Sequence, residues 1–177
     1  AEQGHTGAQN AAASAYSSGQ GVDKNDEEAL RWWRRAAEKK SAEAEFNIGY
    51  AYLTGEGVAA DPVEALAWMT RAAGQGYADA QYMLARFYTE GLGTAPDPRR
   101  AIDWLESAAG KNHAPAMMML GDAYLDGLGV APSKTEAYYW YARAAELDAA
   151  YAEERDLLRA EITPRDVIEI QRRLMSR

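Results

Sequence analysis

Residues 120–130 read Leu-Gly-Asp-Ala-Tyr-Leu-Asp-Gly-Leu-Gly-Val, and close copies of this segment recur at intervals of 36 residues. The recurrence gives complete columns of tyrosine, tryptophan and glycine: Tyr16, Tyr52, Tyr88 and Tyr124; Trp32, Trp68, Trp104 and Trp140; Gly19, Gly55, Gly91 and Gly127; Gly21, Gly57, Gly93 and Gly129. A fixed period of 20–50 residues indicates stacked supersecondary units, none of which can bury its apolar face alone. The sequence therefore predicts a repeat protein.

The second repeat, residues 41–76, shows what each unit contains. Ala44, Ile48 and Tyr52 are spaced as one face of a helix. The glycines within residues 54–57 predict the end of that helix, because glycine adopts backbone angles that other residues avoid. Each repeat is therefore expected to begin with a short helix and a tight turn.

A second helix is predicted to start at Asp61-Pro62, because aspartate caps free N–H groups and proline suits the first helical position. Gly76 is expected to end it. Six residues give this helix its own apolar face: Ala65, Leu66, Trp68, Met69, Ala72 and Ala73. Each repeat is thus a helix–turn–helix hairpin, and the tryptophan column, Trp104 included, is expected to be buried.

The chain divides into the following expected parts: residues 1–4, the tail of a preceding repeat; residues 5–40, 41–76, 77–112 and 113–148, the four repeats; residues 149–177, C-terminal capping helices. A solenoid needs an atypical terminal unit to cover its last apolar face. The alternative for residues 149–177 is a helix that docks a partner. Because residues 1–4 match the end of a repeat, the chain is expected to be a piece of a longer array or a processed chain.

The repeated pattern L-G-x-x-Y-x-x-G-x-G-V, followed by D-P-x-x-A-x-x-W-x-x-x-A-A, resembles the Sel-one-like repeat (SLR), a relative of the tetratricopeptide repeat. The resemblance covers residues 5–148, with Ala13, Ala85 and Thr94 as departures. It implies an all-α fold, a right-handed α/α superhelical solenoid with C-terminal capping helices. It also implies a non-enzymatic adaptor for protein–protein contacts, often in regulation, polarity, secretion or the cell envelope.

Composition narrows the classes of partner. The formal net charge of −8 argues against nucleic acid, because proteins that bind it usually carry a basic surface. No apolar run is long enough for a transmembrane helix in this piece.

The chain has no cysteine, so the fold needs no disulfide and tolerates an oxidising or a reducing compartment. The abundant alanine and the excess of arginine over lysine fit a bacterial chain. The compartment is left open between the periplasm, which is slightly favoured, and the cytoplasm.

No catalytic, metal or cofactor site is expected. His5 and His113 share one repeat position, but zinc needs three or four converging ligands. The repeated Gly-x-Gly follows a helix rather than a strand and lacks the third glycine of a dinucleotide fingerprint. Adjacent acidic residues such as Glu153-Glu154 are expected to be solvated rather than a general acid and base. Of the three hypotheses for the function, an adaptor, a carbohydrate-binding module and an enzyme, the enzyme is therefore the least favoured.

The face of the first helices opposite the core is the predicted binding surface. In the related tetratricopeptide fold, that face lines the concave side. The predicted partner-binding residues are Phe46, Tyr50, Leu53, Tyr82, Arg86, Met118, Asp122 and Leu125. Apolar and aromatic side chains that folding does not require indicate an interaction site. The alternative is that some of them pack between neighbouring repeats.

Acidic residues are expected to surround this surface: Glu43, Asp79, Glu90, Asp122 and Asp126. The sequence therefore favours a neutral to basic protein or peptide as partner. A second hypothesis is a carbohydrate or peptidoglycan-binding module, in which the rings of Phe46, Tyr50 and Tyr82 stack on sugars.

Overall fold

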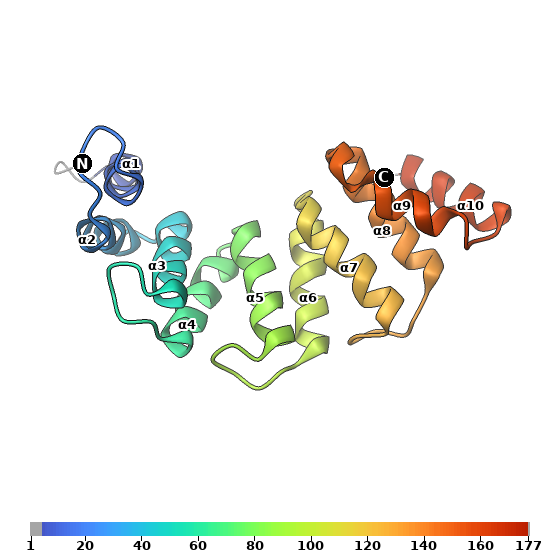
Figure 1. Cartoon of the computed structure of the whole chain (residues 1–177), viewed down its shortest axis with the longest axis horizontal. Helices are drawn as coiled ribbons and strands as arrows, with labels where there is room; N and C mark the ends of the chain where they lie inside the picture. Colours follow the sequence, from blue (N-terminus) through green and yellow to red (C-terminus); the bar gives the residue numbers. More distant parts are fainter. Residues whose placement is uncertain (1–4, 177) are drawn as a thin grey trace. The chain divides into compact units, whose positions relative to one another are not determined.

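The computed structural model describes residues 5–176, and the predicted tail at residues 1–4 lies outside them. The described chain is all-α, and it contains no strand. Figure 1 shows the helices joined by short turns and loops. Their bounds are α1 (Thr6–Ser18), α2 (Asp26–Ala37), α3 (Ala42–Thr54), α4 (Pro62–Gly74), α5 (Ala78–Glu90), α6 (Pro98–Ala109), α7 (Ala114–Asp126), α8 (Lys134–Leu147), the 3-10 helix η1 (Ala149–Tyr151), α9 (Ala152–Arg159) and α10 (Pro164–Met175).

The chain forms two compact units, one up to Pro96 and the other from Asp97. In the first unit, α3 packs against α4 of its own repeat and against α2 of the repeat before it. In the second unit, α7 packs in the same way against α8 and α6. This pattern, in which α3 and α7 each lie between two second helices, is that of an α/α solenoid and confirms the predicted fold class.

The helix starts follow the predicted capping chemistry. Asp61 Oδ1 accepts hydrogen bonds from the backbone N–H groups of Val63 and Glu64, at 3.0 and 3.2 Å. Asn25 and Ser133 cap α2 and α8 in the same way. His113 caps α7 through Nδ1, which accepts from the N–H of Ala116 at 3.1 Å. A capping role thus accounts for this histidine.

We expect Asp61→Ala to lower the free energy of unfolding by about 1 kcal/mol, because two N–H groups at the start of α4 lose their acceptor. Urea unfolding followed by circular dichroism would measure the change. Asp61→Asn is the control, since asparagine keeps the accepting oxygen and should stay close to the parent. An equal loss in both variants would show that the charge, rather than the hydrogen bonds, matters here.

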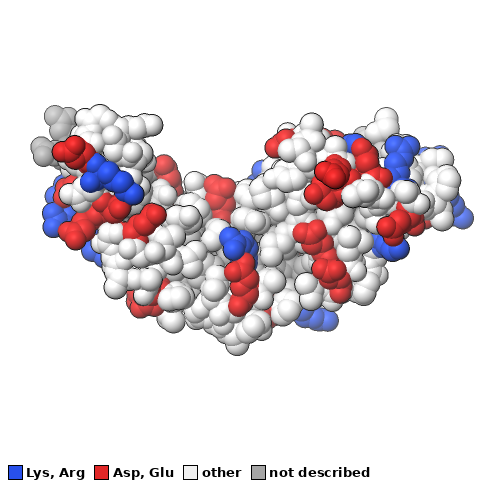
Figure 2. Space-filling model, in the orientation of Figure 1, with Lys and Arg blue, Asp and Glu red and all other residues white. Residues whose placement is uncertain are grey.

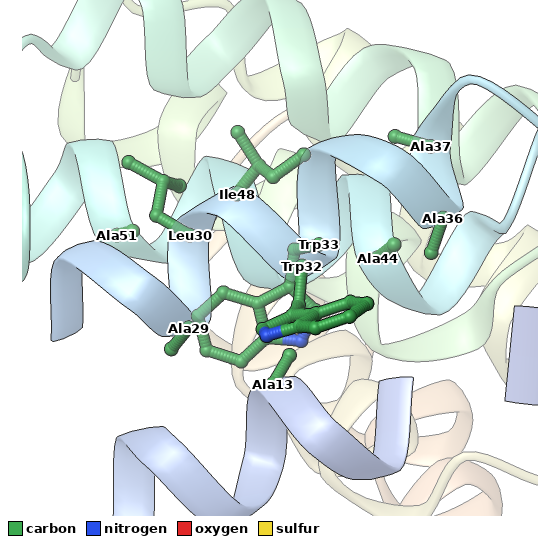
Figure 3. Close-up of a cluster of buried hydrophobic side chains, with 10 residues drawn as sticks. All are labelled: Ala13, Ala29, Leu30, Trp32, Trp33, Ala36, Ala37, Ala44, Ile48 and Ala51. Carbon is green, nitrogen blue, oxygen red and sulfur yellow. The ribbon is translucent and has the colours of Figure 1, made fainter. Parts of the chain in front are cut away.

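One cluster of buried side chains in the first unit spans the three helices α1, α2 and α3. It is drawn in Figure 3 and consists of Ala13, Ala29, Leu30, Trp32, Trp33, Ala36, Ala37, Ala44, Ile48 and Ala51. Ala44 and Ile48 are fully buried, as their spacing predicts, and Tyr52 packs half-buried against the cluster. The small alanines let the helix backbones approach, and the indole rings fill the space between them.

The tryptophan column is less uniform than predicted. Trp32 and Trp140 are buried, each 9 % exposed, whereas Trp68 and Trp104 are only half-buried. The expectation that Trp104 is buried was therefore wrong. At Trp68, the guanidinium carbon of Arg71 lies 4.2 Å from the ring centroid, so a charged side chain covers the outer face of the ring. The column lies at the edge of the helix packing rather than in its centre.

Beyond the fourth repeat, α9 and α10 pack against α8. Leu158, Val167 and Ile170 are buried there. Arg173 joins α10 to α8 in two ways: its guanidinium lies 3.7 Å from the Tyr139 ring centroid, and its Nη1 donates to Glu136 at 2.7 Å. That these helices act as a cap stays a prediction. None of the helices within residues 5–176 is both long and apolar enough to cross a bilayer.

Candidate partner-binding face

The predicted binding residues fall in both units, and each unit is described by itself. Phe46, Tyr50, Leu53, Tyr82 and Arg86 lie on α3 and α5 of the first unit. Met118, Asp122 and Leu125 lie on α7 of the second. All eight are on first helices of their repeats, and none of them is classed as buried. The helix that carries each residue was therefore predicted correctly, whereas their role in binding is untested.

In the first unit, two tyrosine rings pack around the ring of Phe46. Its ring stacks on Tyr50, with centroids 6.5 Å apart, and lies 5.3 Å from the Tyr77 centroid at a tilted angle. Tyr50 keeps 44 % of its surface exposed, while Phe46 is half-buried. Phe46 therefore packs partly between two repeats, and Tyr50 is the more accessible of the two aromatic residues.

Tyr77 was missed by the sequence analysis. It stands at the first position of the third repeat, where the others have His5, Ser41 and His113. The aromatic residue at a position otherwise polar was the available signal. Burial raises the pKa of the Tyr77 hydroxyl, and the nearby charge of Asp79, its hydrogen bond with Asp79 and the charge of Glu43 raise it further. The hydroxyl therefore stays protonated at neutral pH.

The other three residues of the first unit are less available. Leu53 and Tyr82 are half-buried. Arg86 is held along its own helix by Glu90, with Nη2 2.9 Å from Oε1. An exposed pair of this kind contributes little to stability, so Arg86 can exchange Glu90 for a partner at small cost.

In the second unit, α7 presents a mixed surface. Leu125 is 38 % exposed and Met118 half-buried, whereas the neighbouring Met117 is fully buried in the core. Asp122 already has a partner, because its Oδ1 accepts a hydrogen bond from the Tyr141 hydroxyl at 2.6 Å. Burial raises the pKa of Tyr141, and the hydrogen bond with Asp122 adds to the shift. Asp122 thus orders the helix pair as well as carrying charge.

Acidic side chains lie over both units on the face drawn in Figure 2. In the first unit, Glu43 Oε2 accepts from Asn10 Nδ2 at 2.7 Å, which ties the first two repeats together. Within residues 5–176, no group of three or more His, Cys, Asp or Glu side chains is arranged to hold a metal ion.

Stacked helix–turn–helix units with these glycine turns define the class of SLR-type α/α solenoids. A family model described as the Sel1 repeat matches residues 6–41, 42–77, 78–113 and 114–148, and the chain belongs to this family. Proteins built from Sel1 repeats generally mediate protein–protein interactions, and the family is typically non-catalytic. A search of curated proteins finds no match.

Among the solved structures similar to this chain, three illustrate the likeness. The first, c5321, described as a protective antigen of uropathogenic Escherichia coli strains with an SLR fold, is 35 % identical with a TM-score of 0.81 over 83 % of this chain and 32 % of its own. A Sel1 repeat protein from Oxalobacter formigenes is 36 % identical with a TM-score of 0.77, covering 82 % and 60 %. A putative Sel1 repeat protein from Klebsiella pneumoniae, 22 % identical with a TM-score of 0.57, covers 89 % and 79 % and supports the fold alone.

The chain spans about one third of the first of these proteins and 60 % of the second. The activity and partners of those whole proteins therefore do not transfer directly to this chain.

Proposed function

We propose that this protein is a non-enzymatic scaffold whose first-helix face binds a protein or peptide partner. The observation that carries the proposal is the aromatic cluster of Phe46, Tyr50 and Tyr77, in which Tyr50 is 44 % exposed on a side of α3 that the core does not use. Tyrosine rings held by neighbouring rings lose little entropy on binding, which suits them as interface anchors. The wider role is that of an adaptor in a bacterial regulatory, polarity or envelope assembly.

The acidic surroundings support a neutral to basic partner. The chain carries 27 Asp and Glu residues against 19 Lys and Arg. Charges at the rim of an interface steer association and select against partners of the same sign. Binding should therefore weaken as the salt concentration rises.

The test compares the parent with a Phe46→Ala/Tyr82→Ala double variant in pull-downs from the source cell's lysate. We expect the parent to retain a partner that the double variant loses, by about tenfold or more, because two aromatic side chains are removed from the face. Val63→Ala is the matched control, since Val63 is 62 % exposed but lies on the second helix α4. Circular dichroism must show equal helicity for all three proteins.

Retention of the same protein by the double variant would contradict the assignment of this face. The alternative glycan-binding function is tested with the same variants on immobilised peptidoglycan fragments. It is less supported, because the Phe46 ring already packs against the rings of Tyr50 and Tyr77.

A further inference from the structure

A cavity of about 320 Å³ opens in the first unit, between the first helices of the first two repeats. It is lined by Ser14, Ser17, Ser18, Trp33, Asn47, Tyr50, Ala51 and Glu56. Trp33 and Ala51 are the buried members, 8 % and 2 % exposed, and form its floor. Both also belong to the core cluster of Figure 3, so the cavity rests on a rigid base.

The polar groups of the lining are largely unused. Within residues 5–176, the side chains of Ser14, Ser17, Asn47 and Glu56 make no hydrogen bond or ion pair, and the Tyr50 hydroxyl has no partner. Ser18 is the exception, since its hydroxyl donates to the Ser14 carbonyl oxygen at 2.7 Å. Ser14 and Ser17 are three residues apart on α1 and therefore lie on the same side of the helix.

The charges around the cavity favour a cation. Its lining contains one carboxylate, Glu56, and no Lys or Arg. Ser17 and Ser18 are in the last turn of α1, and Glu56 follows the end of α3, so the partial negative charges of two helix C-termini lie nearby. Neither last turn holds a basic residue, and Lys24 after α1 is paired with Asp26 at 3.4 Å.

The equivalent position between the second and third repeats has no such lining. There Phe87 takes the place of Ala51, Met83 that of Asn47, Leu92 that of Glu56 and Met69 that of Trp33. Phe87 and Met69 are fully buried and Met83 is 8 % exposed, so apolar side chains fill the space. Arg86, the counterpart of Ser14 and Tyr50, adds a positive charge. The serines of the first repeat therefore distinguish this site from the next one.

We propose that this cavity binds the side chain of a lysine in the protein partner. The ammonium carries three rotatable donors, which match the separate oxygens of Ser14, Ser17 and Glu56 better than the flat fork of arginine does. The aliphatic stem lies against Tyr50 and Trp33, where an aromatic ring also attracts the charge. The proposal rests on the proposed function, because it names the group through which the partner is recognised.

The probe is the capped peptide acetyl-Gly-Lys-Gly-amide, titrated to millimolar concentration into the ¹⁵N-labelled protein. The chain has five tryptophans, and the indole signal of Trp33 is assigned with a Trp33→Phe variant. We expect saturable shifts of the Trp33 indole and of the Ser17 and Glu56 amides. The same peptide with norleucine in place of lysine keeps the stem without the charge, and it should cause none.

Two exposed residues supply the variants. Glu56→Gln should weaken binding of the lysine peptide by about fivefold at low salt, the upper range for an exposed charge pair. Ser14→Arg copies the charge of Arg86 and should abolish binding. Glu64→Gln removes an exposed carboxylate from the start of α4 and should leave binding unchanged.

Several outcomes would overturn the proposal: no shift confined to the cavity, equal binding of the norleucine peptide, unchanged binding in Glu56→Gln, or tighter binding of an arginine peptide. Shifts caused by N-acetylglucosamine oligomers instead of the lysine peptide would assign the cavity to a glycan.

The proposed function and the lysine assignment can be contradicted independently of each other. If the lysine peptide binds but no partner depends on Phe46 and Tyr82, the cavity is real and the wider face assignment is wrong. If the partner is lost with Phe46 and Tyr82 but retained by Glu56→Gln and Ser14→Arg, the face is right and the lysine assignment is overturned.

Discussion

Gly57→Ala is expected to lower the free energy of unfolding by about 3 kcal/mol or more, one of the two largest effects that the structure predicts. Gly57 has φ +72°, a left-handed conformation that costs a residue with a Cβ about 1–2 kcal/mol. The turn also packs against the start of α2 in the preceding repeat. A Cβ on Gly57 would overlap the Asp26 carbonyl oxygen and lie 2.8 Å from the Glu27 nitrogen.

Backbone atoms cannot move aside as a side chain can, so this overlap adds a further cost of about 1–3 kcal/mol. Gly93 and Gly129 show the same geometry against the carbonyl groups of Pro62 and Pro98. Gly57, Gly93 and Gly129 thus have two roles: each allows the turn between two helices, and each lets that turn pack closely against the repeat before it.

Gly21 provides the matched control. It occupies the same repeat position with φ +77°, but nothing lies within 4 Å of a Cβ placed there. Gly21→Ala should therefore cost only about 1–2 kcal/mol, the conformational part. Urea unfolding of both variants, with the change in midpoint and slope, measures the difference. Equal losses would show that the contact with the preceding repeat contributes nothing.

The fold could be predicted from the sequence because each local signal for a helix or a turn occurs in all four repeats. The glycine turns, the capping residues and the apolar spacing of Ile48 and its counterparts all predict the same helix–turn–helix unit. A fold can be predicted from the sequence when local signals and the overall pattern agree in this way. The same repeat register also predicted which helix carries each of the eight candidate binding residues.

The sequence was insufficient where side chains far apart in the chain meet. Glu45 is 2 % exposed, although a glutamate on a short helix is expected to face water. Its carboxylate is held by Arg71 at 3.2 Å and Gln75 at 2.5 Å, both on or just after α4. The pairing of Phe46 with Tyr77 goes further and joins two repeats. The periodicity of a single helix contains no information about such pairs.

The cavity beside Ser14 and Ser17 was missed for a related reason. The structure places these serines opposite Tyr50 and Glu56 around an open space. Only the packing of α1 with α2 and α3 shows that small polar residues there leave room. Departures from a repeat consensus are therefore where site-specific properties should be sought in this chain.

Phe87→Ala is the second variant with a large expected effect, a loss of about 3–5 kcal/mol in the free energy of unfolding. Phe87 is fully buried, and it is among the largest side chains with no exposed surface. The corresponding residues are Ala15, Ala51 and Ala123, so alanine is the repeat consensus. Substitution toward a consensus commonly stabilises a protein, and the consensus argument thus predicts the opposite sign.

The packing argument should prevail, because Phe87 has no exposed surface and lies on α5, which packs against α4. Removing the ring leaves a void that rigid helices can close only partly, and the lost contacts are not regained elsewhere. Phe87→Leu is the control and should cost only about 1–1.5 kcal/mol, since most of the volume remains. Urea unfolding of the three proteins decides between the arguments. If Phe87→Ala is as stable as the parent, the repeat consensus rather than local packing governs this position.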